Sequence, residues 1–150
     1  MSSSAVLVTV TGDQCDAETV RLGYKLLDSH KGRLIILYVI EIDRAFPVDA
    51  EIPFATSEGE EILKRMEKVA ENFKCETEGE LVQARRAGSA IVQEAFDKKV
   101  DAIVINTIGV ESRGSVLTDD TVPYVINNAP CRVIVWQDPV PNLSQEGLKT

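Results

Sequence analysis

Residues 101–136 of the chain read DAIVINTIGVESRGSVLTDDTVPYVINNAPCRVIVW, and this stretch decides the fold. Asp101 to Thr107 is an apolar run without polar alternation, as expected for a strand that is buried on both faces of a sheet. A polar loop from Ile108 to Asp119 follows, then a helical pattern from Thr121 to Ala129 and a second apolar strand from Cys131 to Trp136. A buried strand, a glycine-bearing loop and a helix N-terminus are the usual components of a phosphate site in α/β proteins. The question for function is therefore whether this loop can still hold a phosphate.

The rest of the chain repeats the alternation of strand and helix. Further strands are expected at Ala5–Val10, at Arg33–Ile40 and, because Gly79 and the glutamates weaken the pattern, as an edge strand at Cys75–Ala84. Asp13 is expected to cap the first helix with Asp16 as its N3 residue, and that helix should end near residues 30–32. Strict alternation predicts an α/β fold with a mostly parallel sheet and helices on both faces.

Three helices have an apolar face that should turn inward. The expected inward residues are Ala17, Val20, Tyr24 and Leu27, then Ile62, Leu63, Met66, Val69, Ala70 and Phe73, and finally Ile91, Val92, Ala95 and Phe96. Glu41–Ser57, with two prolines, is expected to be a long connection that is either functional or mobile. Residues 1–136 should form the domain, and Gln137–Thr150 a surface tail.

Composition narrows the classes of function. At 150 residues with 44% hydrophobic content, the chain can bury the core of one domain. A net charge of −8 disfavours nucleic acid and anionic membranes as partners. No apolar run approaches the roughly 20 residues that a membrane span needs. The N-terminus lacks the basic region of a signal peptide, so a cytoplasmic protein is expected.

Cysteine and histidine usage argues against metal binding and catalysis. The chain has three cysteines without CxxC spacing, Cys15, Cys75 and Cys131, and a single histidine, His30. We therefore expect reduced thiols, no zinc site and no catalytic triad, so the protein is not expected to be an enzyme. Cys15 lies where a helix N-terminus could lower its pKa and allow a redox role, but a partly buried, inert thiol is the favoured interpretation. His30 should complement a helix C-terminus.

Four segments together resemble the universal stress protein family. They are AVLVTVTGD (5–13), LIILYVIE (34–41), AGSAIVQEAFDKKVDAIVINTIG (87–109) and PYVINNAPCRVIVW (123–136). The resemblance implies a single-domain three-layer sandwich with a five-stranded sheet in the order 3-2-1-4-5, and a role in stress response. It also implies a homodimer that pairs through the last strand, with Val133, Ile134, Val135 and Trp136 at the interface.

The nucleotide motif of that family is largely lost in this chain. Nucleotide-binding members carry an aspartate after the first strand and a loop of the form G-x2-G-x9-G-[ST] after the fourth. The corresponding positions here are Thr11 in place of the aspartate, the matching Gly12, Val39 at the adenine contact, and then Asn106, Gly109, Asp119 and Asp120 along the loop. Of the loop positions, Gly109 alone matches, so the chain resembles the class without a complete ATP motif.

The replacements oppose phosphate binding for physical reasons. Two carboxylates within about 5 Å of a polyanion each repel it by roughly 1 kcal/mol or more per charge pair. Asp120 should serve as the N-cap of the last helix, with Pro123 at N3, and its carboxylate should take the amides that a phosphate would use. The Cβ atoms at residues 106 and 119 would also crowd a backbone approach that glycine leaves open. We therefore expect no tight ATP binding and no cofactor.

Two interpretations of function remain open. The favoured one is a dimeric accessory or regulatory domain that acts through an unknown protein partner. The alternative is an ATP- or AMP-binding switch or weak ATPase, using Thr11, Gly12, Val39, Gly109 and the Arg113–Ser115 loop.

Two further features of the loop have competing interpretations. Asp119 and Asp120 could form half of a divalent-cation site with Asp13 or Glu111, but helix capping is favoured. Arg113-Gly114-Ser115 could form an anion nest, but a solvated loop is favoured.

Overall fold

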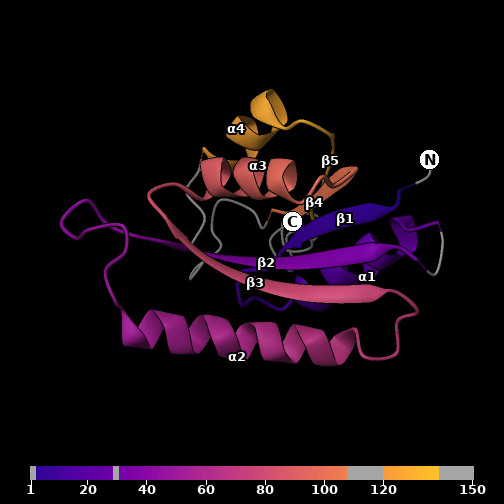
Figure 1. Ribbon diagram of the computed structural model, residues 1–150, viewed down its shortest axis with the longest axis horizontal. Helices are drawn as coiled ribbons and strands as arrows, with labels where there is room; N and C mark the ends of the chain where they lie inside the picture. Colours follow the sequence, from indigo (N-terminus) through magenta and orange to yellow (C-terminus); the bar gives the residue numbers. More distant parts are fainter. Residues whose placement is uncertain (1–2, 29–30, 108–119, 139–150) are drawn as a thin grey trace, which may run out of the picture.

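A computed structural model of the chain describes residues 3–28, 31–107 and 120–138, in which strands and helices alternate throughout (Figure 1). The strands are β1 (Ala5–Thr9), β2 (Arg33–Glu41), β3 (Glu76–Ala84), β4 (Ala102–Asn106) and β5 (Arg132–Trp136). The helices are α1 (Asp16–Leu26), α2 (Pro53–Val69), α3 (Ala87–Asp97) and α4 (Thr121–Asn128). All strand pairs are parallel and the order is β3-β2-β1-β4-β5, which confirms the predicted α/β fold and the order that the resemblance implied.

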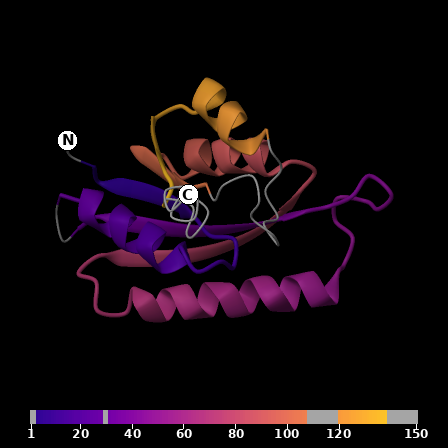
Figure 2. The same cartoon turned by 180° about the vertical axis from the view of Figure 1, so that it is seen from behind.

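The sheet lies between two helical layers because its central strands are apolar on both faces. α1 and α2 cover one face and α3 and α4 the other, as the two opposite views show (Figures 1 and 2). Alternate residues of each strand enter the two cores. The core beside α1 and α2 contains Val6, Val8, Leu34, Ile36 and Val104. The core beside α3 and α4 contains Leu7, Ile35, Leu37, Ile103 and Ile105.

Several predicted helix limits were wrong. α1 ends at Leu26 and not near residues 30–32, while His30 lies outside the described residues. α2 begins at Pro53, so the connection after β2 is shorter than Glu41–Ser57. Proline is well suited to the first turn of a helix, where its missing N–H has no intrahelical partner.

The predicted inward faces were right in part. On α3, Ile91 and Ala95 are buried, but Phe96 is 66% exposed because the buried stripe follows i, i+4 spacing from Ala87. On α1, the face that packs against the sheet includes Gly23, which the pattern did not single out. β3 is an edge strand, as predicted.

Gly23 permits the close approach of α1 to the sheet, and its replacement by alanine tests that packing. An added Cβ would lie 2.4 Å from Cγ1 of Val8 and 3.0 Å from Cδ1 of Leu34. Alanine favours an exposed helix interior over glycine by about 1 kcal/mol, yet Gly23→Ala should destabilise the protein by about 2 kcal/mol through overpacking. Chemical denaturation measures this change. Val8→Ala, which removes the clashing methyl, should recover part of the loss in the double variant, and strictly additive effects would contradict the assignment.

Candidate functional site

The candidate site lies where the carboxyl ends of β1 and β4 meet, next to the point where the strand order reverses. Open parallel sheets bind ligands at this point. Thr11, Gly12 and Asp13 follow β1, Asn106 ends β4, and Asp120 precedes α4. Gly109, Glu111, the Arg113–Ser115 segment and Asp119, all named from the sequence, lie outside the described residues.

Asp16 accepts hydrogen bonds from the two backbone amides that follow β1. The Thr11 amide donates to Oδ1 at 3.1 Å, and the Gly12 amide donates to Oδ2 at 2.7 Å. Gly12 has a φ of +94°, a left-handed conformation that glycine adopts without strain, and this turn aims both amides at one carboxyl group. The chain therefore supplies its own anion to the amides of the β1–α1 loop.

Asp16 is only 4% exposed, and its burial has an electrostatic consequence. Desolvation, with a smaller contribution from the charge of Asp13, raises the pKa of Asp16 to about 6, against the opposing effects of the amide hydrogen bonds and the charge of Arg65. The buried carboxylate therefore persists at neutral pH at an energetic cost, which the amides of Thr11 and Gly12 offset in part.

The predicted capping arrangement of α1 was wrong. Asp16 is the first residue of the helix, and the N-cap residue, Cys15, makes no side-chain cap. Asp13 instead forms a short local turn, in which its Oδ1 accepts from the Cys15 amide at 2.6 Å and its Oδ2 from the Thr11 hydroxyl at 3.0 Å. The Asp16 side chain thus reaches back past the helix start and binds the amides of the loop.

Asp120 precedes α4 as predicted, but it does not cap the helix with its side chain. Its Oδ2 accepts a hydrogen bond at 2.9 Å from the guanidinium of Arg86, the residue immediately before α3. Both side chains are more than half exposed, so the pair contributes little to stability. The ion pair matters for ligand binding, because the carboxylate of Asp120 neutralises a cation, Arg86, that could otherwise attract phosphate.

Glu41 is a site residue that the sequence analysis missed. It ends β2, and its Oε2 accepts a hydrogen bond at 2.7 Å from the amide of Ala87, the first residue of α3. A carboxylate at a helix N-terminus interacts favourably with the helix dipole. The signal in the sequence was an acidic residue at the end of an otherwise apolar strand. Glu41 is therefore a third carboxylate at the carboxyl end of the sheet, and it already accepts a hydrogen bond from a helix amide.

Val39 and Asn106 lie near the carboxyl ends of β2 and β4. Val39 is 3% exposed and packs in the core beside α3 and α4. Asn106 donates from Nδ2 to the Trp136 carbonyl at 3.3 Å, which ties β4 to β5, and its buried Oδ1 has no hydrogen-bond partner among the described residues. The structure thus brings Thr11 and Gly12 to Asp16, and Asn106 to β5.

Among the described residues, the carboxyl end of the sheet has neither a thiol of lowered pKa at Cys15 nor a metal-binding group. The pKa of Cys15 is raised, first by burial and then by Asp13 and Asp138, which agrees with the favoured interpretation of an inert thiol and argues against the redox alternative. Its Sγ lies 3.8 Å from Oδ2 of Asp138. Within the described residues, no group of three or more His, Cys, Asp or Glu side chains could hold a metal ion.

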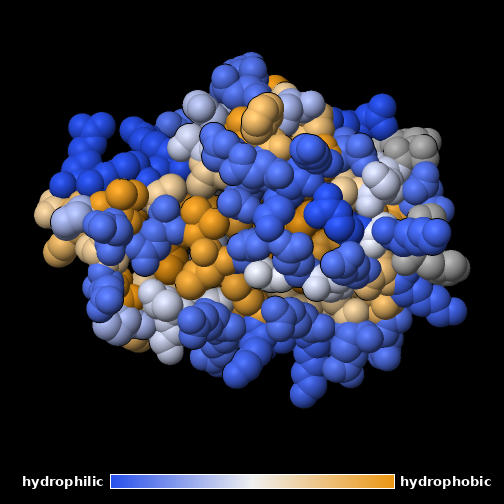
Figure 3. All heavy atoms as spheres, viewed as in Figure 1, coloured by the Kyte–Doolittle hydropathy of each residue, from blue (hydrophilic) through white to orange (hydrophobic). Residues whose placement is uncertain are grey.

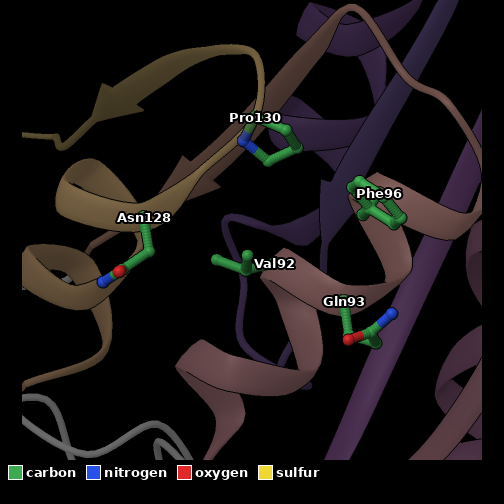
Figure 4. A pocket seen from close by; sticks show the side chains of 5 residues that line it. All are labelled: Val92, Gln93, Phe96, Asn128 and Pro130. Atoms are coloured by element: carbon green, nitrogen blue, oxygen red, sulfur yellow. The ribbon is translucent and has the colours of Figure 1, made fainter.

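A hollow of about 270 Å³ lies at the opposite end of the domain, between α3 and α4 (Figure 4). It is lined by Val92, Gln93, Phe96, Asn128 and Pro130. No charged side chain lines it, so it lacks the groups that would bind phosphate.

β5 is an edge strand of the sheet, on the side opposite β3, and it pairs with β4. Val133 and Ile134 are half-buried, and Val135 is 38% exposed. Trp136 turns toward α1, where its Nε1 donates to the Thr19 hydroxyl at 3.1 Å.

None of the helices in the described part of the chain is long and apolar enough to cross a membrane.

Comparison with known proteins assigns the family. The model of the universal stress protein family matches residues 3–137. Universal stress protein MJ0531 of Methanocaldococcus jannaschii is 25% identical over 140 residues, which cover 89% of this chain and 82% of that protein.

Two solved structures share the fold. A universal stress protein from Archaeoglobus fulgidus has a TM-score of 0.68 at 18% identity, covering 87% of this chain and 96% of its own. A universal stress protein in complex with cAMP has a TM-score of 0.67 at 17% identity, covering 93% and 100%. With the family model matching almost the whole length, the chain belongs to the universal stress protein family.

Proposed function

We propose that this chain is a dimeric accessory or regulatory member of its family, active in stress response and without tight ATP binding. The observation that carries the proposal is that Asp16 already accepts from the amides of Thr11 and Gly12. Glu41 likewise accepts from the first amide of α3, and Asp120 pairs with the guanidinium of Arg86 just before that helix. Because carboxylates already bind the donors at the carboxyl end of the sheet, we infer that the protein acts through contacts with other proteins and has no chemistry of its own.

The balance of energies supports weak binding. A phosphate placed on the loop amides must displace the Asp16 carboxylate, leaving a buried charge without its donors, and such a group costs several kcal/mol. A phosphate that leaves Asp16 in place instead meets like charges, at roughly 1 kcal/mol per pair even at high effective dielectric. Both routes lower the affinity.

Calorimetric titration with ATP, and separately with AMP, tests this function. The wild-type chain should show no saturable heat at micromolar nucleotide, which corresponds to a binding free energy weaker than about −8 kcal/mol. A one-to-one isotherm with a micromolar Kd would overturn the proposal. Protein purified without added nucleotide should correspondingly release none on denaturation.

The dimer is proposed to form through β5. Its exposed edge, with Val133, Ile134 and Val135, is an apolar strand that would be an aggregation risk if left unpaired. Val135→Lys should shift the protein from dimer to monomer in sedimentation velocity, because a strand pair related by two-fold symmetry would bring the two lysines close together. Tyr124→Lys is a matched control, since Tyr124 is 42% exposed but lies on α4. A dimer that survives Val135→Lys would place the interface elsewhere.

The second candidate function is a nucleotide-dependent switch or weak ATPase. The observation that favours it is the structural relative solved with cAMP, which shares the fold over nearly its whole length. In this candidate, Thr11, Gly12, Val39, Gly109 and the Arg113–Ser115 segment hold ATP or AMP. The titration above separates the two candidates.

We further propose a cytoplasmic location, and a domain of residues 1–136 that is followed by a tail.

A further inference from the structure

Among the described residues, no strand pairs with the main-chain groups on the outer edge of β3. β3 pairs with β2 on one side and ends the sheet on the other. The Glu76 amide donates to the Gly32 carbonyl, and the Ala84 carbonyl accepts from the Ile42 amide, so even-numbered residues of β3 point toward β2. Because successive residues of a strand alternate, Leu81 and Gln83 direct their amides and carbonyls outward. This strand is nine residues long, which makes its edge a ready template for another strand.

The two halves of this edge differ in charge. The first half contains Glu76, Glu78 and Glu80, and Lys98, the residue that follows α3, forms ion pairs with the last two. The second half, from Leu81 to Ala84, contains no charged residue. Figure 3 shows hydrophobic side chains gathered between the α2 and α3 layers, toward the end of the molecule where the loop after β2 protrudes.

That loop, residues 42–52, adds large apolar side chains beside the uncharged half of β3. Gln83 holds it in place, donating from Nε2 to the carbonyls of Val48 at 3.0 Å and Ala50 at 2.9 Å. Phe46 is 54% exposed and Val48 45%, and Phe54 at the start of α2 is 80% exposed. We call Leu81, Val82, Phe46, Val48 and Phe54 the β3 surface. Exposed aromatic side chains beside a bare strand edge are the components of a peptide-binding site.

The charge around the β3 surface selects the kind of partner. Residues 42–61 carry six carboxylates, all exposed, against one basic residue, Arg44. Arg85, at the end of β3, turns back to the loop and donates to the Asp43 carbonyl at 2.6 Å. A second copy of this chain would bring the same acidic loop and the glutamates of β3 against their equals, and like charges directly opposite each other are destabilising. A basic partner is complementary.

We propose that the second half of β3 docks an extended, basic segment of another protein, which adds to the sheet as a sixth strand. The main-chain groups of Leu81 and Gln83 bind the segment's backbone. Its apolar residues contact Phe46, Val48 and Phe54, and its lysine or arginine side chains face the carboxylates of residues 42–61. The proposed site does not depend on nucleotide binding, because β2 lies between β3 and the β1 strand that carries Thr11 and Gly12.

The test uses an eight-residue peptide of alternating lysine and valine, added to the full chain labelled with ¹⁵N. Saturable shifts are expected at the amides of Leu81 and Gln83, together with slower hydrogen exchange at both. A peptide of the same sequence and charge, with every second amide N-methylated along one edge, should bind at least tenfold more weakly, because it cannot complete the strand ladder. Equal binding by the methylated peptide would reduce the interaction to charge alone and overturn the proposal.

A pair of matched variants locates the site. Phe54→Ser should weaken peptide binding at least fivefold, whereas Phe96→Ser, at a comparably exposed phenylalanine on α3, should leave it unchanged. Both phenylalanines are exposed, so neither variant should unfold the chain. Equal effects from the two variants would contradict the placement. Self-association that Phe54→Ser abolishes would show that a second copy is the occupant, and would also overturn the proposal.

Discussion

Between about pH 4 and pH 7 the wild-type chain should lose stability relative to an Asp16→Asn variant, by at most about 3 kcal/mol. Burial raises the folded-state pKa of Asp16 from 3.8 to about 6. A raised carboxyl pKa means that the folded state holds its proton more tightly than the unfolded state. The stabilising contribution is therefore complete below the unfolded pKa and is lost as the pH rises through about 6. Asparagine does not titrate, so its curve lacks this term.

Urea denaturation of both proteins at a series of pH values measures the difference. The comparison is needed because other groups act in the opposite direction. Asp101 is one, since hydrogen bonds from the Ser4 amide, the Ser4 hydroxyl and the Ala5 amide lower its pKa, so its contribution is lost on acidification. That term is common to both proteins and cancels. Parallel stability curves for wild type and variant would show that Asp16 is not the buried, destabilised carboxylate described above.

Removing the acidic pair before α4 should restore affinity for ATP. In the Asp119→Gly/Asp120→Ser variant, Kd should fall at least tenfold, because two repulsive terms of roughly 1 kcal/mol each disappear. The same change releases the Arg86 guanidinium from its 2.9 Å ion pair with Asp120, which leaves a cation beside the start of α4. Isothermal titration of the variant and the wild type measures the gain.

Arg86 supplies the control for that experiment. If the released guanidinium attracts phosphate, adding Arg86→Gln to the double variant should remove part of the gain. The same substitution in the wild type should change little, since Arg86 is already paired there. Equal affinities for wild type and double variant would show that repulsion by these carboxylates does not limit binding.

The sheet could be predicted from the sequence because each central strand can be recognised from its own apolar residues. The runs at Ala5–Val10 and Arg33–Ile40 are continuously apolar, and this pattern fits only a strand that is covered on both faces. Helix limits were harder, because α2 extends to Pro53 through residues without a clear apolar stripe, and packing decided its length. Phe96 shows the same limitation, since its type suggested burial but its place on α3 faces away from the sheet.

The site was only partly predictable, because its decisive contacts are tertiary. Asp120 was correctly placed before α4, but its partner, Arg86, lies 34 residues earlier in the chain and no local pattern joins them. Glu41 and Ala87 likewise meet only through the sheet. Asp16 was identified as acidic and close to the first helix start, but the direction of its carboxyl group depends on the left-handed turn at Gly12. Charge could be read from the sequence, whereas hydrogen-bond partners could not.

The most direct test of the central claim is a ¹⁵N NMR titration of the wild-type chain with ATP, followed at the amides of Thr11, Gly12 and Ala87. These three donors already bind Asp16 and Glu41, so their resonances should stay unchanged up to nucleotide concentrations near millimolar. Saturable shifts at the Thr11 and Gly12 amides with a micromolar midpoint would show that phosphate displaces the chain's own carboxylate, and would contradict the account.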